Sequence, residues 1–99
     1  MFEAFIWHFP FYLDRFVYGK SGQNSCPPGY SYITSIDECQ LAATTLGQSY
    51  SSSEILGTFP RGCYLYSKDN RVWFNDVATG GAQKLGKLLC IRGMIFCLY

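Results

Sequence analysis

The sequence is poor in charge, and its basic residues are not clustered. Lysine, arginine, aspartate and glutamate make up 15% of the 99 residues, and the formal net charge is +1. Lys84 and Lys87 are the only close basic pair near the end of the chain. Because nucleic-acid binding requires a basic patch or stripe, we expect no nucleic-acid partner and assign this pair to a solvated surface.

Histidine occurs once, as His8, and this limits what the cysteines can do. The sequence has five widely spaced cysteines: Cys26, Cys39, Cys63, Cys90 and Cys97. No two of them form the C-x-x-C pair that is typical of zinc sites. A cysteine nucleophile needs a histidine nearby, and His8 is separated from the cysteines by a polar linker. We therefore expect no metal site, no cofactor and no cysteine-dependent catalysis.

A complete phosphate-binding loop is also lacking. Gly81 to Lys87, GAQKLGK, fits G-x-x-x-x-G-K, but Leu88 stands where a serine or threonine would contact magnesium. We interpret this segment as a turn and expect no nucleotide. Among the acidic residues, Asp37 and Glu38 suit a helix start and Asp69 suits a turn, so no catalytic carboxylate pair is indicated. The expectation is a protein that is not an enzyme.

No apolar run is long enough for a membrane span, which takes roughly 20 residues. The first 18 residues, Met1 to Tyr18, are strongly aromatic but include Asp14 and Arg15. An aromatic strip beside a small domain is typical of a surface that packs on a partner or lies at a membrane interface. The alternative is that it folds back on its own domain. The predicted partner-binding residues are Phe2, Phe5, Trp7, Phe9, Phe11, Tyr12 and Phe16.

Against these absences, the stretch from Cys26 to Gly47 has a clear local pattern. Ser35 and Glu38 have the spacing of a capping box, which marks a helix start. Gly47 is suited to the left-handed conformation that ends helices. Between them, small and apolar residues recur on one narrow stripe that can approach a sheet closely: Cys39, Ala42, Ala43 and Leu46.

A hairpin is predicted from Gly62–Tyr66 and Arg71–Asn75, joined by a turn at Ser67–Asn70. One face of the two strands suits the core beneath the helix: Cys63, Leu65, Val72 and Phe74. The other face carries three aromatic residues that could stack on a sugar ring or another flat ligand: Tyr64, Tyr66 and Trp73. The alternatives are that they cover a protein or pigment partner, or that the N-terminal strip folds over them.

Shorter strands are predicted at Tyr30–Thr34 and Leu85–Arg92, with a serine-rich loop at Gln48–Glu54 and a flexible loop at Asp76–Lys84. The predicted fold is α+β, with one helix packed on a small antiparallel sheet. The chain divides into an aromatic docking segment (1–19), a linker (20–25), the compact domain (26–92) and an apolar C-terminal tail (93–99).

Four of the cysteines are expected to form two disulfides. Cys39 and Cys63 fall on inner faces, whereas Cys26 opens the domain and Cys90 lies on its last strand. We predict Cys39–Cys63 and Cys26–Cys90, one of three pairings of four cysteines, and therefore an oxidising compartment. The alternative is reduced, buried thiols. Cys97 is left over, either free and buried in a contact or paired with another chain.

Residues 26–92 resemble a cysteine-rich domain that recurs in proteins of dinoflagellates and other algae. The matching motifs are CPPGYSYITSIDEC, AAxxLG, FPRGCYLY, VWFN and LLCIR. A weaker resemblance links the chain to PAN/apple domains, in which a helix is disulfide-linked to a sheet, although those have more strands and cysteines. The algal resemblance implies a module of secreted, lumenal or membrane-attached proteins.

Together these observations predict a non-enzymatic structural or accessory subunit that docks on protein subunits of a larger membrane-associated assembly, with peripheral membrane contact. In an alga, a photosystem with its antennae is the expected host, and the thylakoid lumen or membrane surface is the favoured location. The extracellular or secretory route is the alternative location. The alternative function is a carbohydrate-binding module that uses the exposed aromatic residues of the sheet.

Overall fold

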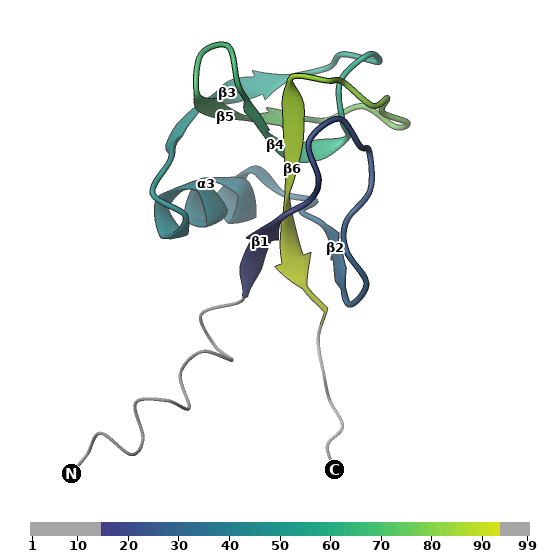
Figure 1. Cartoon of the computed structure of the whole chain (residues 1–99). Coiled ribbons are helices and arrows are strands. Elements are labelled where there is room, and N and C mark those ends of the chain that lie inside the picture. Colours follow the sequence, from purple (N-terminus) through teal and green to yellow (C-terminus); the bar gives the residue numbers. More distant parts are fainter. Residues whose placement is uncertain (1–14, 94–99) are drawn as a thin grey trace, which may run out of the picture.

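The computed structural model describes residues 15–93, which contain one helix and six strands (Figure 1). The α+β class predicted from the sequence is confirmed. In chain order the elements are β1 (Phe16–Tyr18), β2 (Tyr30–Tyr32), α3 (Ile36–Thr45), β3 (Ser49–Glu54), β4 (Gly62–Tyr66), β5 (Arg71–Asn75) and β6 (Gly86–Arg92).

The sheet is organised around β6, its longest strand. The order is β1-β6-β4-β5-β3, and β2 also pairs with β6. The first residues of β6 pair with β4, and its last residues pair with β1 and β2, in each case antiparallel. The predicted hairpin of β4 and β5 is confirmed, with Cys63 opposite Phe74 and Leu65 opposite Val72.

Strand β3 corrects two predictions. The segment was expected to be a serine-rich loop in an antiparallel fold, but it forms an edge strand parallel to β5, so the sheet is mixed. A register shift between Tyr50 and Ser52 interrupts the pairing. A strand at an edge packs few side chains, and four serines show no apolar alternation, so the periodicity used to predict strands was missing.

Helix α3 begins as the capping pattern predicts. The Ser35 side chain accepts a hydrogen bond from the Glu38 backbone N–H at 3.1 Å. The predicted stripe faces the sheet. Its small residues are completely buried: Cys39, Ala42 and Ala43. Leu46, the last residue of the stripe, is partly buried and packs against the same cluster. Small side chains let the helix axis approach the strands closely, so this one short helix packs against β3, β5, β6 and β4.

The helix ends in the glycine motif expected of a Schellman turn. Gly47 has a φ of 76°, and its N–H donates to the Thr44 carbonyl at 3.1 Å. The Gln48 N–H donates to the Ala43 carbonyl at 2.8 Å. These two bonds satisfy carbonyls that the helix leaves free and turn the chain directly into β3.

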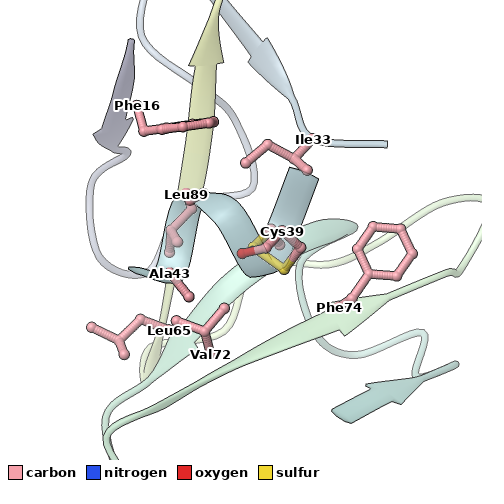
Figure 2. Close-up of a cluster of buried hydrophobic side chains, with 10 residues drawn as sticks. Phe16, Ile33, Cys39, Ala43, Leu65, Val72, Phe74 and Leu89 are labelled. Atoms are coloured by element: carbon pink, nitrogen blue, oxygen red, sulfur yellow. A yellow bond between two sulfur atoms is a disulfide. The ribbon is translucent and has the colours of Figure 1, made fainter. Parts of the chain in front are cut away.

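The core beneath α3 is a single cluster of buried side chains (Figure 2). The predicted Cys39–Cys63 disulfide is confirmed and joins the helix to β4 inside this cluster. The predicted inner face of the hairpin is also confirmed. Completing the cluster are three side chains from outside the helix and hairpin: Phe16, Ile33 and Leu89.

Phe16 was predicted to bind a partner, and this prediction is wrong. Phe16 lies in β1 opposite Ile91, is only 3% exposed, and packs in the core of its own domain (Figure 2). The sheet therefore begins at Phe16 rather than at Cys26, and residues 20–25 connect two parts of one domain. The other predicted docking residues lie outside the described residues, as does Cys97: Phe2, Phe5, Trp7, Phe9, Phe11 and Tyr12.

Candidate functional site: the aromatic face of the sheet

The face of the sheet turned away from α3 is built from aromatic rings. Tyr64, Leu88 and Cys90 form its buried base, and the predicted Cys26–Cys90 disulfide is confirmed beside them. Around this base, five aromatic residues are only partly buried, and we call them the aromatic face: Tyr30, Tyr32, Phe59, Tyr66 and Trp73. Within residues 15–93 the only helix packs on the opposite side.

Tyr64 was predicted to contact a ligand, but the structure places it underneath the surface. Its side chain is 2% exposed, and the ring of Phe59 lies over it at a centroid distance of 5.4 Å. Its hydroxyl donates a hydrogen bond to Glu54. Burial, and then this bond to the carboxylate, raise the pKa of Tyr64 far above its usual range. Tyr64 is therefore a structural residue that supports the face.

Tyr66 and Trp73, the other two predicted ligand residues, remain partly accessible. Phe59 packs edge-on against Tyr66, with an angle of 78° between the rings. The indole N–H of Trp73 donates to one oxygen of Asp69 at 3.0 Å, and the other oxygen accepts from the Arg71 N–H at 2.9 Å. The Asp69 turn therefore holds the Trp73 ring in one orientation and leaves part of it open to solvent.

Phe59 belongs to a loop that sequence reasoning did not connect with the site. The loop is held by Asn75, whose side chain is 1% exposed at the end of β5. The Asn75 amide nitrogen lies 2.8 to 3.2 Å from three loop carbonyls, and its oxygen accepts from the Leu56 N–H at 2.9 Å. An asparagine at the last position of a buried strand was the only sequence signal for this arrangement.

The segment around Gly80 is packed on the same loop, although it was predicted to be flexible. The Gly81 N–H donates to the Phe59 carbonyl at 3.0 Å. A Cβ atom on Gly80 would lie 2.3 Å from the Arg61 backbone nitrogen, so no other residue fits there without a backbone shift. Phe59 is therefore held over Tyr64 from two directions, by Asn75 and by the chain at Gly80.

Two arginines lie over the tyrosines of β2, which sequence reasoning did not select. The Arg61 guanidinium is 5.3 Å from the centre of the Tyr32 ring, and the Arg92 guanidinium is 5.7 Å from that of Tyr30. The Tyr32 hydroxyl donates to the Asn24 carbonyl at 2.8 Å. This part of the face therefore presents positive charge together with aromatic area.

A cavity of about 400 Å³ lies away from the aromatic face, between the start of α3 and the ends of β3 and β5. Its lining residues are Ile36, Ser53, Glu54, Ile55, Phe74 and Asp76. No histidine, lysine or cysteine is among these lining residues. Among residues 15–93, no group of three histidine, cysteine or acidic side chains could hold a metal ion.

The fold and its two faces define the chain as an α+β domain with two disulfides, which indicate an oxidising compartment. Comparisons with protein-family models, with curated proteins and with solved structures each find no match. The resemblance to the algal cysteine-rich domain therefore stays a prediction. In the part of the chain that the structure describes, no helix is both long and apolar enough to cross a membrane.

Proposed function

We propose that this protein is a non-enzymatic structural subunit that docks on a larger membrane-associated assembly through the apolar segments at its two ends. The observation that supports this is the position at which the described chain begins and ends. Phe16 pairs with Ile91, and the Arg92 N–H donates to the Arg15 carbonyl at 2.8 Å. The chain therefore enters and leaves the domain at one end of the sheet, which we call the terminal pole (Figure 1).

The sequences that continue from this pole are apolar. Residues 1–14 contain six large aromatic residues, and residues 94–99 read MIFCLY. Two segments that start at adjacent points can engage one partner together, and the second contact then forms at a high effective concentration. The helix-side core is already filled by the domain's own side chains, so the domain itself contributes a rigid body and the ends contribute attachment.

The two disulfides indicate that the protein works in an oxidising compartment. The thylakoid lumen or membrane surface is the favoured location, with an algal photosystem–antenna complex as host. The extracellular or secretory route is the alternative. Cys97, within the apolar tail, is either buried in the contact with a partner or paired with another chain.

The test is association of the full chain with its host during native purification in mild detergent, followed by mass spectrometry of the purified assembly. We expect the chain to co-purify with membrane proteins, and a variant without residues 1–14 to be lost from the assembly. The matched control is Trp73→Ala, which changes the aromatic face and leaves the ends intact. Co-purification of the truncated variant at the wild-type level would refute the docking role of this segment.

A second candidate function, carbohydrate binding, is favoured by the fixed orientation of Trp73. An aromatic ring that is held by Asp69 and partly open to solvent can stack on a sugar without losing further conformational freedom. Titration with sugars, followed by tryptophan fluorescence, tests this function. Binding that Trp73→Ala abolishes supports it, whereas the absence of any fluorescence change across a glycan panel contradicts it.

A further inference from the structure

At the hairpin end of the aromatic face, an exposed arginine stands beside two partly accessible rings. Arg71 lies directly opposite Tyr66 in the register of β4 and β5, and Trp73 follows two residues later on β5. Because successive side chains of a strand point to opposite faces, these three share the aromatic face. The Cβ atoms of directly opposite residues are about 5 Å apart, so the Arg71 charge lies next to the Tyr66 ring.

At the other end of the aromatic face, two more arginines lie over rings. The Arg61 guanidinium is 5.3 Å from the centre of the Tyr32 ring, and the Arg92 guanidinium is 5.7 Å from that of Tyr30. Such contacts orient a guanidinium without neutralising its charge, so both arginines keep their attraction for anions.

The two groups follow each other along β6. β4 ends opposite Gly86, and β2 begins opposite Arg92. Because β1 occupies the other side of the last residues of β6, β4 and β2 lie one after the other on the same side (Figure 1). From Gly86 to Arg92 the strand spans roughly 20 Å at about 3.3 Å per residue. An extended ligand can therefore contact both groups, whereas a single sugar ring reaches only one.

The two carboxylates that contact the aromatic face are already engaged. Glu54 accepts the hydrogen bond from Tyr64, and the two oxygens of Asp69 accept hydrogen bonds from β5. Within residues 15–93, no ion pair joins an arginine of this face to a carboxylate. The face therefore presents unpaired positive charge at both ends, which complements an anionic ligand.

We propose that the aromatic face binds an acidic polysaccharide. Its sugar rings stack on Trp73 and the neighbouring rings, and its anionic groups are bound by Arg71 at one end and by Arg61 and Arg92 at the other. Aromatic rings offer broad apolar area, and arginine donates to oxyanions in a fork geometry. This inference rests on the second candidate function, carbohydrate binding, and names the class of sugar. Single-stranded nucleic acid is bound by similar groups, but the disulfides indicate a compartment other than the cytosol or nucleus.

The test is isothermal titration calorimetry of the full chain with three soluble derivatives of one β-1,4-glucan: hydroxyethyl cellulose, carboxymethyl cellulose and cellulose sulfate. We expect both anionic derivatives to bind more tightly than the neutral one. Arg61→Gln/Arg71→Gln should weaken binding of the anionic derivatives about tenfold, because each exposed ion pair contributes roughly threefold in affinity. Trp73→Ala should weaken binding of all three about tenfold, because it removes the stacking surface.

The matched control removes two positive charges from the helix side of the sheet. Arg15 lies over Phe16 and Lys87 over Tyr18, and both rings pack in the cluster beneath α3. Arg15→Gln/Lys87→Gln should change binding by no more than about twofold, since only screened, distant attraction is lost. Thermal unfolding of each variant confirms that the domain is folded.

A preference for the anionic derivatives that Arg61→Gln/Arg71→Gln reduces and the control variant retains supports the inference. Equal binding of all three derivatives, weakened by Trp73→Ala, overturns the inference and leaves carbohydrate binding in place. Equal losses in the two charge variants overturn it as well. If polyglutamate or single-stranded DNA binds as tightly as the anionic derivatives, the face recognises charge rather than sugars, and the inference falls. The absence of binding to any derivative contradicts this inference, whereas the glycan panel and the co-purification test the two proposed functions separately.

Discussion

The two faces of the sheet are closed in different ways. On one face, a ten-residue helix with a stripe of small residues lies close to the strands, and the side chains between them are buried. On the other face, Phe59 in a loop covers Tyr64, and the surrounding rings remain partly open. Each face has one disulfide, Cys39–Cys63 beneath the helix and Cys26–Cys90 on the aromatic face.

The difference shows which face is available for contacts. A helix satisfies its own backbone hydrogen bonds and can seal a core without help. A loop needs partners for its carbonyls, which Asn75 supplies here. Closure by a loop and large rings leaves aromatic edges partly accessible on that side, whereas the helix side is closed by small buried side chains.

The largest expected effects come from the disulfides, and they compare the two faces directly. Cys26–Cys90 closes a sequence separation of 64 residues and Cys39–Cys63 one of 24. If restriction of the unfolded chain dominates, Cys26→Ala/Cys90→Ala should lower the free energy of unfolding by about 4 kcal/mol and Cys39→Ala/Cys63→Ala by about 3.5 kcal/mol. Urea denaturation measures both. A clearly larger loss for the Cys39 and Cys63 pair would mean that packing beneath the helix outweighs chain entropy.

The next effect is expected from Asn75→Ala, which removes the side chain that holds the loop over Tyr64. Buried loop carbonyls would lose their donor, and we expect a loss of about 3 kcal/mol in the free energy of unfolding. Trp73 and the tyrosines would become more accessible to a fluorescence quencher. The control is Gln40→Ala on the exposed side of α3, which should change neither measurement.

Added volume should be tolerated differently on the two faces. Ala43 is completely buried beneath the helix, so Ala43→Leu should destabilise the domain by about 2 kcal/mol through overpacking. Val17 is only partly buried on the aromatic face, and Val17→Leu should change the stability by no more than about 0.5 kcal/mol. The melting temperatures of the two variants measure this difference. Equal decreases in melting temperature would contradict the claim that the two faces tolerate added volume differently.

The smallest effect concerns the hydroxyl of Tyr64. Tyr64→Phe removes its hydrogen bond to Glu54 and should lower the free energy of unfolding by about 1 kcal/mol. Because the pKa of Tyr64 is raised in the folded state, the unfolded chain releases this proton more easily. The stabilisation is therefore present below about pH 10, the ordinary tyrosine pKa, and is lost as the pH rises above it. Urea denaturation at a series of pH values above about 10 should show that the free energy of unfolding declines less in Tyr64→Phe than in the wild type.

Much of the local structure followed from short-range patterns. The cap at Ser35, the stop at Gly47 and the alternation in the hairpin each depend on residues that are near neighbours in the chain. These patterns place Cys39 and Cys63 on inner faces. Together with the positions of Cys26 at the start of the domain and Cys90 on its last strand, they were sufficient to predict both disulfides. The same reasoning selected Tyr64 as a ligand residue, because alternation identifies a face without showing what lies over it.

The remaining features depend on which distant segments meet. Phe16 enters the core because β1 pairs with β6, the serine-rich β3 is a strand because β5 lies beside it, and Tyr64 is buried because Asn75 holds Phe59 above it. Arg92 lies over Tyr30 only because β2 pairs with β6. Local sequence determines periodicity and caps, whereas register, coverage and the placement of charges over rings arise from contacts between residues far apart in the chain and require the folded structure.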